Sequence, residues 1–222
     1  MDRSQQVQGR KRVGIMGGTF DPIHIGHLIL GESAYEQFGL DSVMFMPSGN
    51  PPHKRSRDGG ADNEERITMV RLAIDDNPHF ALSLEEMHDQ GYTYTKETLA
   101  RLTQANPDTD YYFIMGADSL LSFESWKEPE EICRLCTLVV AVRDHMPQEE
   151  LDRQIAHISG RFHADIRKLS TLNMDVSSRQ IREWVLQGRS CRYYVPGRVM
   201  DYIQENRIYR ETEEDIGEEA DD

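Results

Sequence analysis

The stretch GIMGGTFDPIHIGHLIL, residues 14–30, decides the fold prediction, because it has the pattern of a buried strand, a glycine turn and the start of a helix. This order is typical of a phosphate-binding turn, since glycines let the backbone approach a ligand and a helix N-terminus attracts anions. Neither common phosphate-binding pattern, G-x-G-x-x-G or G-x-x-x-x-G-K-[ST], is present in it. Instead, the expected helix start carries two histidines, His24 and His27.

The turn offers an anion site made of backbone amides at the positive end of a helix. These amides belong to Gly18, Thr19 and Phe20. His24 and His27 are three positions apart, so they project from one helix face beside this site. They could ligate zinc, with only Asp21 as a third ligand in the stretch, or they could be satisfied structural histidines. Imidazoles that hydrogen-bond a polyphosphate and stabilise charge on a reacting phosphorus fit the adjacent anion site better.

Strand and helix patterns alternate through the whole chain, without an internal repeat or a linker. The expected strands are 12–17, 42–47, 80–84, 110–116 and 137–142. The expected helices are 24–38, one capped by Asp62 or Asn63, 94–105, 128–135, 148–158 with a stop at Gly160, 177–188 and 196–206. This alternation predicts an α/β fold, a Rossmann-like doubly wound parallel sheet with a small C-terminal helical part. We expect a single domain at 12–210, after a flexible extension at 1–11.

The acidic charge of the chain is concentrated at its C-terminal end. The 222 residues carry a net charge of −14, and ETEEDIGEEADD (211–222) holds eight acidic residues and no basic one. Without this segment, 25 basic residues face 31 acidic ones, a net charge of −6. We expect 211–222 to be a disordered, solubilising tail. A mildly acidic domain argues against nucleic acid as a partner and leaves a small anionic ligand open.

The sequence shows no sign of membrane insertion or export. No apolar run reaches the roughly 18 residues of a membrane span, and the first residues lack the apolar stretch of a secretory signal. We therefore expect no membrane partner and a cytoplasmic location.

Of three cysteines, Cys133 and Cys136 form a C-x-x-C. Without further ligands at matching spacing, we interpret them as small apolar residues rather than a redox or zinc site. The oligomeric state stays open, a homo-oligomer included.

The motif GGTFDPIHIGHL (17–28) resembles the signature of nucleotidyltransferases with an H-x-G-H motif, which act by in-line attack. Further motifs over residues 12–209 resemble, within this superfamily, bacterial nicotinate-nucleotide adenylyltransferases, which make deamido-NAD from ATP and nicotinate mononucleotide. The resemblance implies that His24 and His27 are catalytic and hold phosphates along the reaction line. It also implies that Mg²⁺ enters through the ATP phosphates, with no metal ligand from the protein, and that no covalent enzyme intermediate forms.

Two basic residues are assigned to the mononucleotide side by the resemblance. PSGNPPHK (47–54) resembles the family's P-x-x-x-P-P-H-K loop, which implies that Lys54 is a catalytic cation that orients phosphate. Arg143 follows an expected strand, at a place where the family often has an arginine that binds substrate.

The pyridine pocket is implied by two further motifs. YTKETL resembles the family's Y-T-x-x-T-L, whose tyrosine and threonine, here Tyr94 and Thr95, border the pyridine ring. In GADSLLSFESWKEPEEI (116–132), Trp126 would stack on the nicotinate ring, because an aromatic face suits a flat π-system. The family often has tyrosine after this tryptophan, and Lys127 departs from that pattern.

Two motifs carry the resemblance on the ATP side. The residues it implies there, besides those of the first turn, are Gly116, Asp118, Ser177, Ser178 and Arg182. Asp118 would accept a hydrogen bond from a ribose hydroxyl. VSSRQIRE (176–183) resembles I-S-S-T-x-I-R, and its serines stand at a helix N-terminus, where hydroxyls, amides and dipole can hold phosphates. Arg179 replaces the usual threonine, and the sequence assigns it no role.

Other functions remain open at this point. The chain could be an adenylyltransferase for nicotinamide mononucleotide or another phosphorylated acceptor, since one contact to the carboxylate decides between acid and amide. Pantetheine-phosphate adenylyltransferases usually have T-x-G-H, so His24 and Trp126 speak against that acceptor. The chain could also be a nucleotide-binding regulatory module without turnover, which the intact histidines and Lys54 disfavour.

Overall fold

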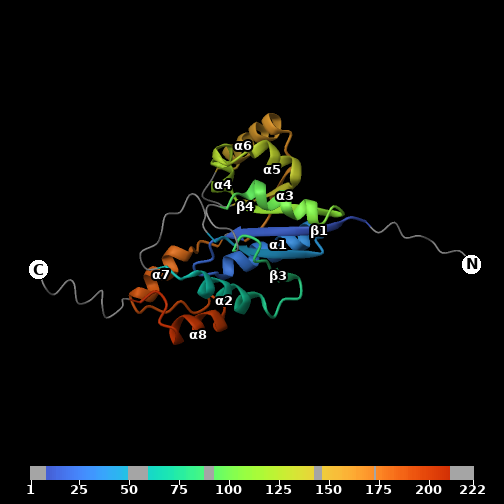
Figure 1. Cartoon of the computed structure of the whole chain (residues 1–222). Helices are drawn as coiled ribbons and strands as arrows, with labels where there is room; N and C mark the ends of the chain where they lie inside the picture. Colours follow the sequence, from blue (N-terminus) through green and yellow to red (C-terminus); the bar gives the residue numbers. More distant parts are fainter. Residues whose placement is uncertain (1–8, 50–59, 88–92, 143–146, 173, 211–222) are drawn as a thin grey trace, which may run out of the picture.

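Six parallel strands form one sheet in the computed structural model, which describes residues 9–49, 60–87, 93–142, 147–172 and 174–210 (Figure 1). The strands are β1 (Lys11–Gly18), β2 (Ser42–Pro47), β3 (Phe80–Leu82), β4 (Thr109–Gly116), β5 (Thr137–Ala141) and β6 (Ile166–Leu169). Their order is β3-β2-β1-β4-β5-β6, so the direction of the chain across the sheet reverses between β1 and β4. This order confirms the predicted Rossmann-like sheet, and ligands of such sheets bind where the order reverses.

Helices cover both faces of the sheet (Figure 1). They are α1 (Ile25–Phe38), α2 (Asn63–Ile74), α3 (Thr95–Ala105), α4 (Ala117–Leu121), the 3₁₀ turn η1 (Phe123–Ser125), α5 (Pro129–Leu135), α6 (Gln148–Phe162), α7 (Ser178–Leu186) and α8 (Gly197–Glu205). The first core lies under α1, α2, α7 and α8. The second core lies under α3 to α6, on the opposite face. The C-terminal helices therefore pack beside the helices of the first half of the chain.

The two cores follow from the alternation of side chains along each strand, which point in turn to opposite faces. In β4, Phe113 belongs to the core under α3 to α6, and Ile114 belongs to the other core. In β5, Val139 and Val140 divide in the same way, and both are fully buried. Near-continuous apolar strands are expected of a parallel sheet that is covered on both faces.

Several predicted boundaries differ from the structure. The prediction that Gly160 stops a helix is wrong, because α6 continues through it and ends where His163 adopts a positive φ of 52°. A Cβ added at Gly160 would meet no atom within 4 Å, so nothing in the packing requires a glycine or a helix end at this position. Strand β3 ends at Leu82 rather than 84. Strand β6 was not predicted, because IRKL is a short edge strand with two charged residues.

The C-x-x-C pair is packed in the second core. Cys133 lies in α5 and Cys136 caps it, and each side chain is buried. Burial raises the pKa of the Cys133 thiol to about 11, and burial also raises the pKa of Cys136. Both thiols are therefore protonated at neutral pH, which supports their interpretation as apolar residues. Within the described ranges, no group of three or more His, Cys, Asp or Glu side chains is placed to hold a metal ion.

The ends of the chain carry two predictions that the structure does not reach. The acidic segment 211–222 and residues 1–8 of the expected extension lie outside the described residues, so the proposed domain limits remain predictions. Among the helices that are described, none is both long enough and apolar enough to cross a membrane.

Replacement of Ile114 by Ala should lower the free energy of unfolding by about 2–5 kcal/mol, because Ile114 is 3% exposed and its truncation leaves a cavity in the core. Chemical denaturation followed by circular dichroism measures this difference. Leu121→Ala is the matched control, since Leu121 is 43% exposed and should change the value by less than about 0.5 kcal/mol. Equal losses in both variants would contradict the assigned core.

Candidate active site

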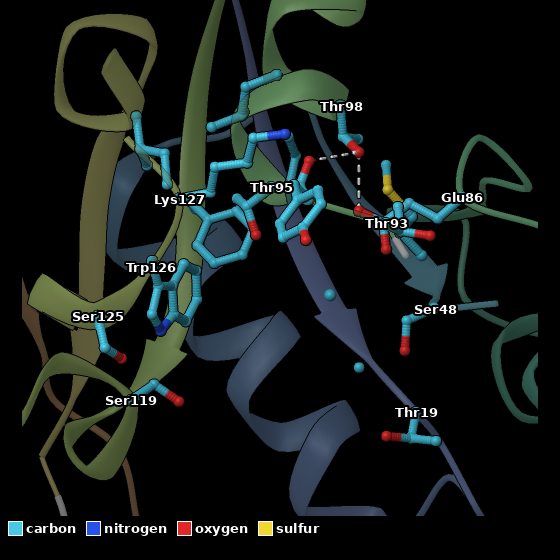
Figure 2. A pocket seen from close by; sticks show the side chains of 18 residues that line it. Thr19, Ser48, Glu86, Thr93, Thr95, Thr98, Ser119, Ser125, Trp126 and Lys127 are labelled. Atoms are coloured by element: carbon cyan, nitrogen blue, oxygen red, sulfur yellow. Dashed lines mark hydrogen bonds between the residues drawn. The ribbon is translucent and has the colours of Figure 1, made fainter. Parts of the chain in front are cut away.

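A cavity of about 610 Å³ opens beside the carboxyl end of β1, where the sheet order reverses (Figure 2). Gly17 and Gly18 at the end of β1 form part of its lining, together with Met46 of β2 and Phe113 of β4. Most of the remaining walls come from the start of α3 and from the segment between α4 and α5, and Ser48, Glu86 and Ser119 complete the polar lining. Segments far apart in the sequence therefore meet at the place where a doubly wound fold binds its ligand.

Trp126 forms one wall of this cavity. Figure 2 shows Trp126 and Ser125 on one side and Glu86, Thr93 and Ser48 on the other. The indole ring meets Phe113 edge-on, with ring centroids 6.0 Å apart and planes at 90°. A second ring, Phe123 in η1, lies 5.5 Å from it. Two aromatic contacts thus hold the indole against the core while it lines the cavity, as a stacking platform requires.

The two histidines lie together at the start of α1. His24 is the N-cap residue, and the centroids of the His24 and His27 rings are 3.8 Å apart. The backbone N–H of His24 donates to Nδ1 of His27 at 3.2 Å. Because Nδ1 accepts this bond, the neutral His27 ring carries its proton on Nε2, which can donate to a phosphate oxygen. The Phe20 ring packs edge-on against His27 at 5.0 Å and limits its rotation.

Gly26 makes room for the His24 ring. A Cβ at this position would lie 3.1 Å from Nδ1 of His24 and 3.2 Å from a methyl carbon of Val176. The pattern H-x-G-H therefore has a steric basis, because the glycine lets the first imidazole fold back over the helix start. His24, Gly26 and Val176 line a small hollow separate from the large cavity.

Asp21 connects the turn between β1 and the two histidines of α1, which we call the histidine turn, to three other parts of the chain. Its carboxylate accepts the Tyr209 hydroxyl at 2.9 Å and the backbone N–H of Ala61 at 3.0 Å. Arg182 of α7 donates to the Asp21 carbonyl oxygen at 2.6 Å and lies 3.6 Å from the carboxylate. Burial, together with Asp21, raises the pKa of Tyr209 far above its usual range, so the hydroxyl remains a donor. The turn is thereby fixed before any ligand binds.

The serines predicted to hold phosphates also have structural partners. Ser177 is the N-cap of α7 and accepts the backbone N–H of Gln180 at 3.2 Å. The Ser178 hydroxyl donates to the carbonyl oxygen of Pro22 at 2.8 Å. These contacts bring the N-terminus of α7, with its backbone amides, to the histidine turn. Direct contact of Ser177, Ser178 or Arg182 with ATP remains a prediction.

Arg66 is a buried residue of this region that the sequence analysis missed. It is 1% exposed and donates to the Thr19 carbonyl oxygen and to the Asn63 side chain, each at 2.6 Å. A signal was present, because Arg66 lies in helical register with Met69, Val70 and Ala73, which are all buried. A charged residue on a buried helix face needs a hydrogen-bond partner, and here the histidine turn supplies one through the Thr19 carbonyl oxygen.

The comparisons with known proteins agree with this geometry. Residues 15–184 match the cytidylyltransferase-like family model. A protein of Lachnoclostridium phytofermentans named probable nicotinate-nucleotide adenylyltransferase is 43% identical over 199 residues, which cover 90% of this chain and 99% of the relative. A protein of the same name from Thermoanaerobacter sp. is 40% identical over 204 residues, 91% and 96% of the two chains. The chain belongs to the nicotinate-nucleotide adenylyltransferase family.

Solved structures support the fold of this family member. The Plasmodium falciparum nicotinic acid mononucleotide adenylyltransferase complexed with NaAD matches with a TM-score of 0.73 and 19% identity, over 90% of this chain and 97% of that one. The same enzyme complexed with APC matches with a TM-score of 0.71, 19% identity and the same coverage. At this identity the likeness concerns the fold, and it agrees with the sheet order described above.

Of the other predicted site residues of this adenylyltransferase, some line the cavity, some lie outside its lining, and two lie outside the described residues. Tyr94 and Thr95 line the cavity together with Trp126, and their contact with a pyridine ring remains a prediction. Gly116 caps α4 at the carboxyl end of β4, and Asp118 is exposed in the first turn of α4, outside the cavity lining. Lys54 and Arg143 lie outside the described residues. Polar lining residues that the sequence analysis missed are Ser48, Glu86, Thr93, Thr98, Ser119 and Ser125.

Removal of the Tyr209 hydroxyl should destabilise the protein through the loss of its bond to Asp21. We expect Tyr209→Phe to lower the free energy of unfolding by about 1.5–3 kcal/mol, because the acceptor is a buried charged group. Tyr193→Phe is the matched control, since Tyr193 is 84% exposed and should be nearly silent. If denaturation curves of the two variants coincide, the Asp21 contact carries no stability.

Proposed function

We propose that the chain transfers AMP from ATP to nicotinate mononucleotide and thereby forms deamido-NAD and pyrophosphate. One observation carries this proposal, the continuity between an aromatic cavity and the histidine turn. Gly18 and Thr19 line the cavity that also contains Trp126, and the same turn leads within a few residues to His24 and His27. A pyridine ring in the cavity would thus have its phosphate near the anion site. The name of the relatives, probable nicotinate-nucleotide adenylyltransferase, supports the same acceptor.

The proposed reaction needs positioning rather than a base. A phosphate oxygen of the mononucleotide attacks the α-phosphorus of ATP, the new P–O bond forms, and the bond to pyrophosphate breaks. Because the attacking phosphate is already anionic, no proton has to be removed. The Nε2–H of His27 and the amides of the turn would stabilise the charge that develops on the α-phosphate. Mg²⁺ enters as part of the Mg·ATP substrate and offsets charge on the departing pyrophosphate.

The remaining site residues take proposed roles in binding. Trp126, Tyr94 and Thr95 would hold the pyridine ring, and Lys54 and Arg143 would contact the mononucleotide. On the ATP side, we assign phosphate to the first turn of α7 with Ser177, Ser178 and Arg182. The ribose is assigned to the loop that begins at Gly116, with Asp118 as acceptor.

A single measurement tests the acceptor. Purified protein with Mg·ATP receives nicotinate mononucleotide or nicotinamide mononucleotide, and both pyrophosphate and dinucleotide are quantified. We expect kcat/KM to favour the acid by about tenfold or more, since one polar contact separates the two substrates. An amide preference has one observation in its favour, because Glu86 is a carboxylate in the cavity wall and could accept the amide N–H. Turnover of neither mononucleotide would refute the proposed acceptor.

His24→Ala should lower kcat by about 10²- to 10³-fold with the fold retained, because it removes an imidazole to which we assign a role in holding phosphate. Steady-state kinetics measure the loss, and thermal unfolding with ATP binding confirms a folded protein. His157→Ala provides the control, since its ring lies on α6 beside Glu124, on the other face of the sheet. A variant with normal turnover would exclude His24 from catalysis, and a wild type that binds ATP without turnover would indicate a regulatory module.

A further inference from the structure

Two ion pairs join the two segments that carry the aromatic residues of the cavity. Lys127 Nζ lies 2.6 Å from Glu97 Oε1, and Lys96 Nζ lies 3.1 Å from Glu128 Oε1. Glu97 and Lys96 belong to the first turn of α3, whereas Lys127 and Glu128 follow Trp126. Each segment thus contributes one cation and one anion. We call these four residues the clasp.

Charge interactions and a cation–π contact support the Lys127–Glu97 pair of the clasp. The hydrogen bond from Lys127 lowers the pKa of Glu97, and the same bond raises the pKa of Lys127, so both groups are charged at neutral pH. Glu97 also lies in the first helical turn, where the helix dipole favours an anion. The ammonium of Lys127 lies 4.1 Å from the centroid of the Tyr94 ring, a cation–π contact with a cavity residue.

The clasp acts next to the residues that shape the cavity. Lys127 follows Trp126 directly, and Lys96 follows Tyr94 and Thr95. Figure 2 shows Lys127 and Thr95 between the Trp126 side of the cavity and the opposite side. Glu128 has a positive φ of 51° and precedes Pro129, the first residue of α5, so this turn has few alternative conformations. The position of Lys127 therefore restricts the position of its neighbour Trp126.

We propose that the clasp positions the pyridine pocket: Lys127 and Glu97 hold Trp126 at the correct distance from Tyr94 and Thr95 for the mononucleotide ring. This inference rests on the proposed function. Half-exposed ion pairs contribute little to global stability, so their effect falls on local geometry. Lys127 stands where the family often has tyrosine, and the clasp gives this departure a role in which the side chain acts through its neighbours.

A different role for Lys127 predicts the opposite effect at Glu97. If the ammonium bound the nicotinate carboxylate directly, removal of Glu97 would release it for the substrate and the KM for the mononucleotide would fall. If Lys127 is a positioning residue, loss of either partner breaks the same bond and raises that KM. The sign of the Glu97 effect therefore separates the two roles.

The test is a double-mutant cycle with Lys127→Met, Glu97→Gln and the double variant, at saturating Mg·ATP. We expect each single variant to raise the KM for nicotinate mononucleotide about three- to fivefold, with kcat and the KM for ATP unchanged. The double variant should show no larger change than either single one, because both remove one interaction. Arg134→Met is the matched control, since it breaks the Arg134–Glu131 pair within α5.

Ionic strength gives a second readout. In the wild type, the KM for the mononucleotide should rise more between 50 mM and 500 mM salt than in the double variant, because salt screens the clasp. A lower KM in Glu97→Gln, additive effects in the cycle, or an equal rise in the KM for ATP would each overturn the proposal. The proposed function fails separately, if the wild type does not use nicotinate mononucleotide.

Discussion

Asp21 is 3% exposed, and a buried carboxylate must be hydrogen-bonded. It accepts hydrogen bonds from Ala61 and Tyr209, while Arg182 forms an ion pair with it and donates to the Asp21 carbonyl oxygen. The start of α2, helix α7 and the residues after α8 all converge on it. Arg66 extends the same arrangement to the Thr19 carbonyl oxygen. The histidine turn therefore owes its shape to helices that lie far from it in the sequence. Without these donors, the anion site would be a glycine-rich loop with many conformations.

Two of the residues predicted to contact phosphate have structural partners within the protein. Arg182 and Ser178 were interpreted from the sequence as phosphate contacts, and in the structure they donate to backbone carbonyls of Asp21 and Pro22. Such bonds hold the turn and the N-terminus of α7 in fixed positions beside each other. Electrostatic preorganisation requires groups that are held rigidly before a substrate arrives, and the fixed turn meets this condition for the proposed anion site.

The sequence predicted those features that local pattern determines. Apolar runs and helix caps determine the alternation of elements, and glycine followed by two histidines marks the first turn. It failed where tertiary contacts decide. The edge strand β6 has a polar pattern, α6 passes Gly160 because nothing there enforces an end, and the donors to Asp21 come from α7 and the C-terminal segment. Polar residues such as Glu86 and Ser48 line the cavity because of the paths of loops at the edge of the sheet, and the periodicity of the sequence does not predict these paths.

The bond between Tyr209 and Asp21 joins residues 188 positions apart. Protein synthesis proceeds from the N-terminus, so the turn emerges from the ribosome early and obtains this donor only after almost the entire described chain has been translated. A nascent chain with a formed β1 and α1 would still have an uncompensated carboxylate beside its histidines. Formation of the ordered turn is thereby coupled to translation of the segment that contains Tyr209.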